Sequence, residues 1–130
     1  IDWIINRCAG FIYSTAPAPA ALGAVEAALE LVPTLDAERA RLAAMGDALR
    51  AALRARDIDT LASSTQIVPA IMGREDAALA AAQRLREAGI LAIAIRPPTV
   101  PPGSARLRFA LSAALTDTQF ERVLAAVAAL

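Results

Sequence analysis

Two arginines and a lone threonine stand beside a proline-rich loop in the C-terminal half of the chain. Residues 94–112 read AIRPPTVPPGSARLRFALS, in which four prolines lie within six residues. Proline fixes φ, so this loop loses little freedom on folding. Residues two apart share one strand face, which places Arg106 and Arg108 together, opposite Leu107 and Phe109. A guanidinium matches a carboxylate with two hydrogen bonds, so the pair could clamp an anion.

The same residues also have plainer interpretations. Alternation alone fits an outer strand face on which both guanidinium groups are solvated. Thr99 carries the single side-chain hydroxyl within the rigid part of the loop, and it could contact a ligand or simply stabilise the turn. A second hydroxyl pair, Ser14 and Thr15, precedes a predicted helix. This pair could bind phosphate at the helix N-terminus or act as a helix cap.

Composition argues against several classes of function. The chain has 130 residues, enough for about one domain with a core. Its 13 basic residues are all arginine, are spread along the chain and are balanced by 13 acidic ones, whereas nucleic-acid binders need a clustered basic footprint. One cysteine and no histidine point to no metal site, and a single thiol fits a reducing cytoplasm. No apolar run approaches the roughly 20 residues of a membrane span.

Hydrophobic spacing and turn residues predict the elements that position these side chains. Leu42, Met45, Leu49 and Leu53 repeat at intervals of three and four, which is typical of one buried helix face. Pro69 lies inside an apolar run and predicts an edge strand or a bulge. The predicted elements are helices over residues 20–31, 36–56 and 75–88, strands over 65–73, 90–95 and 106–111, and a last helix capped by Thr116 and Gln119.

The order of these elements predicts the fold class. The predicted order is helix, helix, strand, helix, strand, strand and helix. This order indicates an α/β fold of two layers, with helices packed on one short sheet. The strand over 90–95 is expected to be buried, and FIYST at 11–15 is β-prone. The apolar residues among 1–20 have no evident partner inside such a layer. We therefore expect them to expose surface that meets another part of the protein.

Two segments together resemble a known enzyme family. FIYSTAPAPA at 11–20 and AIRPPTVPPGSARLRFALSAALT at 94–116 are similar to the C-terminal part of the α-oxoamine synthases, which are fold-type-I pyridoxal-phosphate enzymes. The resemblance spans nearly the whole chain. RPPTVP is its most specific part and points to the branch that makes 8-amino-7-oxononanoate in biotin biosynthesis. Sister members of the 5-aminolevulinate synthase, 2-amino-3-ketobutyrate ligase and serine palmitoyltransferase types share the arginine strand but carry other loops, and they stay open as alternatives.

The resemblance implies a reaction and roles for single residues. The reaction condenses L-alanine with a pimeloyl thioester of CoA or acyl carrier protein, with loss of carbon dioxide and the thiol, and pyridoxal phosphate serves as electron sink. Arg108 matches the arginine that holds the amino-acid carboxylate, and Thr99 matches a substrate-contacting threonine. Ser14 and Thr15 match hydroxyls that reach the cofactor phosphate across the interface of a cytoplasmic homodimer. Arg106 is left as a structural residue or an ion-pair neighbour.

The departures from the family pattern concern the catalytic half. The chain has no lysine, so the family's Schiff-base lysine has no counterpart. We therefore expect residues 1–30 to form the tail of the large domain with an interdomain helix, and residues 31–130 to form the small C-terminal α/β domain. The large domain then lies outside this chain, and the chain alone is inactive. A non-catalytic α/β binding or dimerisation module is the other hypothesis.

Overall fold

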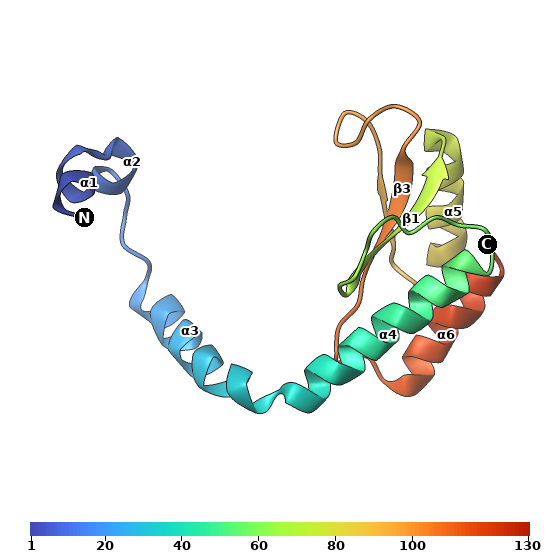
Figure 1. Cartoon of the computed structure of the whole chain (residues 1–130), viewed down its shortest axis with the longest axis horizontal. Helices are drawn as coiled ribbons and strands as arrows, with labels where there is room; N and C mark the ends of the chain where they lie inside the picture. Colours follow the sequence, from blue (N-terminus) through green and yellow to red (C-terminus); the bar gives the residue numbers. More distant parts are fainter. The chain divides into compact units, whose positions relative to one another are not determined.

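The computed structural model describes residues 1–130 as two compact units (Figure 1). The first unit is Ile1–Asp36 and the second is Ala37–Leu130. No helix in either unit is both long and apolar enough to span a bilayer. The first unit contains helices α1 (Asp2–Arg7), α2 (Ala9–Ile12) and α3 (Pro19–Leu31), followed by the 3-10 helix η1 (Val32–Thr34).

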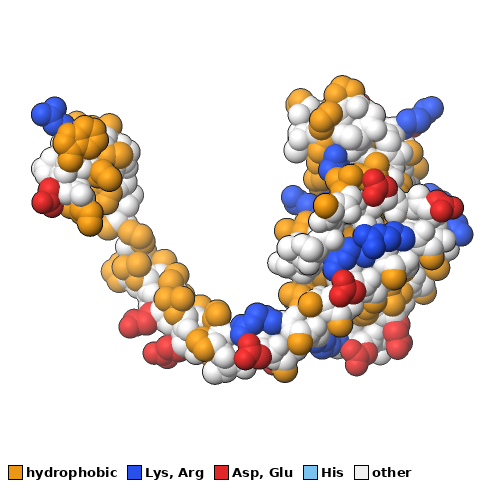
Figure 2. Space-filling model, in the orientation of Figure 1, with side chains coloured by type: hydrophobic (Ala, Val, Ile, Leu, Met, Phe, Trp, Pro, Cys, Tyr) orange, Lys and Arg blue, Asp and Glu red, His pale blue; other side chains and the backbone are white.

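The first unit buries none of its side chains. Its large hydrophobic residues include Trp3, with 74% of its surface exposed, and Tyr13, with 85% exposed. Orange hydrophobic side chains gather on the visible face of this unit (Figure 2). The β-prone stretch at 11–15 forms no strand and instead contains the end of α2 and a turn. A strand needs a neighbour for its backbone hydrogen bonds, and the unit has no other strand to supply one.

The second unit is built on three antiparallel strands. They are β1 (Ile67–Gly73), β2 (Ile93–Ile95) and β3 (Ala105–Ala110), in the order β1-β3-β2. The prediction for Pro69 is confirmed, because β1 is an edge strand and its register shifts between Ile71 and Gly73. An edge strand tolerates a residue without an N–H because only one side is paired.

The prediction of a buried strand over 90–95 was wrong in its length and its burial. β2 is three residues long and lies at the other edge of the sheet, with Ile93 exposed. Gly89, with φ +78, follows the end of the preceding helix. The chain from Ile90 to Ala92 then passes beside the sheet without pairing. Periodicity alone cannot tell a central from an edge strand when the run is short and apolar.

Three helices cover one face of the sheet and form the core with it. They are α4 (Asp36–Arg54), α5 (Glu75–Glu87) and α6 (Asp117–Ala128) (Figure 1). The predicted helix face is confirmed, since Met45, Leu49 and Leu53 are buried and Leu42 packs against them. This confirms the α/β fold of two layers. The core joins side chains of all three helices with Val68, Ala70, Leu107, Phe109 and Leu111 from the sheet and its end.

One arginine fastens α4 to the connection between β3 and α6. Arg41 donates to the carbonyl oxygens of Ala113 at 2.8 Å and Leu115 at 2.7 Å, and to the Asp117 carboxylate at 2.7 Å. The predicted capping box is also present, because Thr116 and Gln119 each accept a hydrogen bond from the other's backbone N–H. These contacts fix where β3 ends and α6 begins.

Candidate functional site

The sheet face turned away from the helices carries a cleft of about 480 Å³. Its floor comes from all three strands, and one wall comes from the segment between α4 and β1. Its lining mixes apolar side chains with hydroxyls and two guanidinium groups. The lining residues are Leu61, Ala62, Ser63, Ser64, Thr65, Ile67, Pro69, Ile95, Arg106 and Arg108.

The strand register explains why the two arginines share this cleft. Leu107 and Phe109 are buried in the core, so the alternate residues Arg106 and Arg108 lie on the opposite face, as predicted. Arg108 pairs across the sheet with Pro69 on one side and Ile93 on the other. Arg106 pairs in the same way with Ile71 and Ile95, so each guanidinium extends from a row of apolar cross-strand neighbours.

The two arginines differ in what they contact. Arg106 is half-buried, and its Nε donates to the carbonyl oxygen of Ser104 at 3.0 Å. The exposed Arg108 guanidinium has no hydrogen-bond or ion-pair partner in the chain. A guanidinium offers five N–H donors in a planar fork, so Arg108 can receive a carboxylate through two of them. Arg106 instead ties the strand to the proline loop.

The proline loop between β2 and β3 is held by its own short hydrogen bonds. Thr99 N donates to the carbonyl oxygen of Arg96 at 3.0 Å, and Ser104 Oγ donates to that of Pro101 at 2.6 Å. Gly103 has φ +76, a conformation that favours glycine. Thr99 is exposed and is not among the residues that line the cleft. The structure thus brings Arg108 and Arg106 together but does not bring Thr99 into their cleft.

Ser14 and Thr15 lie in the first unit, between α2 and α3. Ser14 Oγ donates to the carbonyl oxygen of Phe11 at 2.9 Å, and both residues are exposed. Neither caps α3, because the residue at its N-cap is Ala18. Both hydroxyl oxygens can accept or donate further hydrogen bonds, as a phosphate contact requires. Two hydroxyls could together bind one edge of a phosphate group. The chain contains no lysine that could bind a cofactor covalently.

One wall of the cleft comes from residues that the sequence pattern does not single out. Residues 61–65 read LASST, and all five line the cleft. The run of three hydroxyl residues before a strand is the one feature of the sequence that could have indicated a binding wall, but such runs are common in turns. What places them beside Arg108 is the course of the chain from α4 to β1, which local pattern does not reveal.

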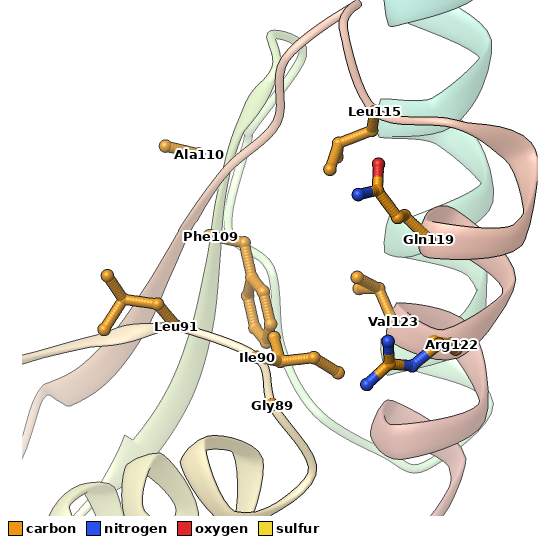
Figure 3. A pocket seen from close by; sticks show the side chains of 9 residues that line it. All are labelled: Gly89, Ile90, Leu91, Phe109, Ala110, Leu115, Gln119, Arg122 and Val123. Carbon is orange, nitrogen blue, oxygen red and sulfur yellow. The ribbon is translucent and has the colours of Figure 1, made fainter.

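A second cavity of about 240 Å³ lies between β3, α6 and the segment after α5 (Figure 3). The Phe109 ring, Ile90 and Val123 border it (Figure 3). Its polar groups are already engaged: Arg122 Nη2 donates to the carbonyl oxygen of Ala88 at 3.3 Å, and Gln119 belongs to the capping box. This cavity therefore presents no free polar group comparable to Arg108.

Comparison with known proteins identifies the family of the chain. The family model described as aminotransferase class I and II matches residues 1–127. The chain belongs to the aminotransferase class I and II family. The 8-amino-7-oxononanoate synthase of Gluconacetobacter diazotrophicus is 56% identical over 126 residues, which are 97% of this chain and 32% of that protein. A protein of Bordetella parapertussis that carries the same enzyme name provisionally is 57% identical over 128 residues, 98% of this chain and 32% of its own length.

Three solved structures show the same fold as the chain. The chain superposes on serine palmitoyltransferase of Sphingomonas wittichii with a TM-score of 0.87 at 24% identity, covering 98% of this chain and 33% of that one. A structure of SPT with PLP gives 0.89 at 23% identity, with coverages of 98% and 33%. The 8-amino-7-oxononanoate synthase of Francisella tularensis gives 0.80 at 24% identity, with coverages of 98% and 37%. The chain thus has the fold of part of a fold-type-I pyridoxal-phosphate enzyme and spans about a third of the length of these relatives.

Proposed function

We propose that this chain is the C-terminal part of an α-oxoamine synthase that condenses L-alanine with a pimeloyl thioester to 8-amino-7-oxononanoate. The observation that carries the proposal is the Arg108 guanidinium, which lies in an open cleft without a partner in the chain. Identity above 50% to enzymes of that name supports it. The overall reaction releases carbon dioxide and the thiol of CoA or acyl carrier protein.

Arg108 binds and orients the amino acid in this proposal. Two of its five N–H donors hold the alanine carboxylate, so the carboxylate is fixed against one wall of the site. Arg106 keeps the end of the proline loop attached to β3 through Ser104. Thr99, exposed on that loop, is then available to contact the acyl substrate rather than the carboxylate.

Pyridoxal phosphate is the cofactor in this proposal, as the matching SPT structures with PLP support. When bound, it supplies an electron sink at the amino-acid α-carbon. Ser14 and Thr15 would hold its phosphate from the partner subunit of a homodimer in the cytoplasm. The amine that binds the cofactor comes from a large domain outside this chain, since the chain has no lysine. Residues 1–30 belong to the tail of that domain and an interdomain helix, and residues 31–130 form the small domain.

The decisive experiment is an assay of the whole protein. Pyridoxal phosphate, L-alanine and pimeloyl-CoA are added, and products are separated by mass spectrometry. We expect 8-amino-7-oxononanoate together with carbon dioxide and free CoA. A parallel reaction with L-serine and palmitoyl-CoA tests the sister activity that the serine palmitoyltransferase fold suggests. A product in the second reaction and none in the first would contradict the proposed substrates.

A further inference from the structure

The segment between α4 and β1 forms a wall of the Arg108 cleft that the proposed function leaves without a role. Leu61, Ser63, Ser64 and Thr65 from this segment line the same cleft as Arg108. Ser63 Oγ donates to the carbonyl oxygen of Ile67 at 2.9 Å, and Thr65 Oγ1 accepts from Ile67 N at 3.2 Å. The segment is therefore bound to the first residue of β1, the strand that pairs with the one carrying Arg108.

The segment adopts a conformation that costs free energy. Leu61 has φ +51, in the left-handed region that β- and γ-branched residues rarely occupy. Thr60 is 1% exposed, and its Oγ1 atom has no hydrogen-bond partner. Leu61 N donates to the Asp59 carboxylate at 2.8 Å, which stabilises the turn locally. Because strain and an unpaired buried hydroxyl both oppose this conformation, other contacts must hold the segment in place.

A buried arginine supplies those contacts. Arg50 of α4 is only 6% exposed. Its Nη1 donates to the carbonyl oxygen of Thr65 at 2.7 Å and lies 3.4 Å from Ser63 Oγ, while Nη2 donates to the Asp47 carboxylate at 2.7 Å. A buried charge destabilises a fold unless its hydrogen bonds are made. Arg50 makes them to the segment and to its own helix.

The close approach of the segment to α4 depends on a glycine. A Cβ atom at Gly46 would lie 3.1 Å from Arg50 Nη2 and 3.3 Å from the carbonyl oxygen of Thr65. Both distances are tighter than ordinary van der Waals contact. Gly46 is also buried, so a larger residue would push the guanidinium or the segment away. The helix is therefore shaped to let Arg50 reach across to Thr65.

We propose that Arg50 is a positioning residue for the substrate cleft. By holding residues 63–65 against α4, it fixes the wall that confines a carboxylate anchored by Arg108. This inference rests on the proposed function, which supplies the identity of the ligand, L-alanine. The hydrogen bonds from Arg50 to the segment do not depend on that function. Arg50 itself is buried behind the wall and does not line the cleft.

The test compares three variants of the whole protein by amide hydrogen exchange and by steady-state kinetics. Arg50→Lys keeps the charge, but an ammonium cannot reach both acceptors with fork geometry. Arg50→Met removes the charge, and Arg54→Lys is the control on the same helix, at an exposed arginine outside the cleft. We expect Arg50→Lys to speed exchange of the Ser63 and Ile67 amides, which donate to the Thr60 carbonyl oxygen and to Thr65 Oγ1, about tenfold, as loss of a charge-assisted hydrogen bond implies.

The kinetic expectation separates positioning from a structural role. In Arg50→Lys the KM for L-alanine rises roughly three- to tenfold, while kcat and the KM for pimeloyl-CoA change less than about twofold. Arg50→Met has a larger effect on both readouts, and Arg54→Lys matches the wild type. If amide exchange is unchanged in Arg50→Lys, Arg50 does not hold residues 63–65 in place. Faster exchange with an unaltered KM for alanine would overturn the positioning role. A wild-type protein without alanine-dependent turnover would instead contradict the proposed function. Amide exchange would then still show whether Arg50 holds residues 63–65 in place.

Discussion

Arg106 and Arg108 stand two residues apart on one strand face and have different surroundings. Arg106 is half-buried and donates to Ser104, whereas Arg108 is exposed and unpartnered. The sequence pattern predicts that they share a face, because strand periodicity is local. It could not predict which of them is engaged by the backbone, since that depends on where the proline loop returns to β3.

The first prediction concerns a single residue, in the variant Arg108→Ala of the whole protein. The variant loses a charge-assisted carboxylate pair, so the KM for L-alanine rises about ten- to a hundredfold, while the KM for the pimeloyl thioester changes far less. Arg108→Lys recovers only part of the loss, because an ammonium lacks the two-pronged geometry. Steady-state kinetics measure both effects.

Arg106→Ala serves as the matched control for that experiment. Its guanidinium binds the carbonyl oxygen of Ser104, so its removal lowers the melting temperature and leaves the alanine KM within about twofold of the wild type. An exchange of behaviour between the two variants would show that Arg106 is the carboxylate ligand. If neither variant alters the alanine KM, both arginines belong to a solvated face.

At the scale of the element, the start of α6 is fixed by the Thr116 and Gln119 capping box. Thr116→Ala leaves an N–H of the first turn without its partner, so the free energy of unfolding falls by about 1 kcal/mol. Urea unfolding followed by circular dichroism measures it. Thr118→Ala, two residues further along the same exposed turn, is the control and changes stability by less than about 0.5 kcal/mol. Equal losses in both variants would contradict the role of the cap.

The start of α5 carries a pH-dependent contact. The hydrogen bond from the Arg74 guanidinium, at 2.9 Å from Nε, lowers the pKa of the Asp76 carboxyl from its ordinary 3.8, and the Ala77 N–H adds to this. Because the pKa of Asp76 is lower in the folded state, its contact with Arg74 adds to the free energy of unfolding above pH 3.8. This contribution is lost as the pH falls through the pKa of Asp76 in the folded protein.

At the start of α5, we therefore expect Arg74→Ala to raise the pKa of Asp76 toward 3.8 without fully restoring it, because the Ala77 contact remains. A carbon-detected NMR titration of the Asp76 carboxyl reports this value directly. An Asp76 pKa that stays the same in the variant would show that the guanidinium does not contact the carboxylate in solution.

Elements were predictable from sequence where local signals decide them. The capping box, the Leu49 helix face and the Pro69 edge strand each depend on spacing or on one residue's chemistry, and all three are found. The short strand β2 was predicted too long and too buried, because β-propensity shows neither where pairing ends nor whether a strand lies at an edge. The β-prone stretch at 11–15 was not predicted to be a strand and forms none. The wall at 61–65 depends on a hydrogen bond from Arg50, 15 residues before Thr65 in the chain, which no periodic signal encodes.

At the scale of the whole molecule, the chain consists of a unit with a core and a unit without one. The first unit exposes Trp3, Phe11 and Tyr13 and buries nothing. Large exposed apolar patches mark interaction surfaces. The expectation that residues 1–20 expose apolar side chains is thus met within this chain, and we propose that the large domain covers them.

The fourth prediction concerns the chain of residues 1–130 alone. It gives no turnover with pyridoxal phosphate, L-alanine and pimeloyl-CoA, because it contains no lysine to bind the cofactor. Mass spectrometry of the reaction mixture, with the whole protein as positive control, measures it. Product formation by the chain alone would mean that the catalytic amine lies elsewhere than we propose.

A crystal structure of the whole protein with pyridoxal phosphate and L-alanine shows whether Arg108 binds the amino-acid carboxylate. The quantity to measure is the distance from each alanine carboxylate oxygen to the Arg108 guanidinium nitrogens. We expect two contacts of about 2.7–2.9 Å, in the geometry of a bidentate pair. A carboxylate bound to other residues, with the Arg108 guanidinium left in solvent, would show that Arg108 is not the carboxylate ligand.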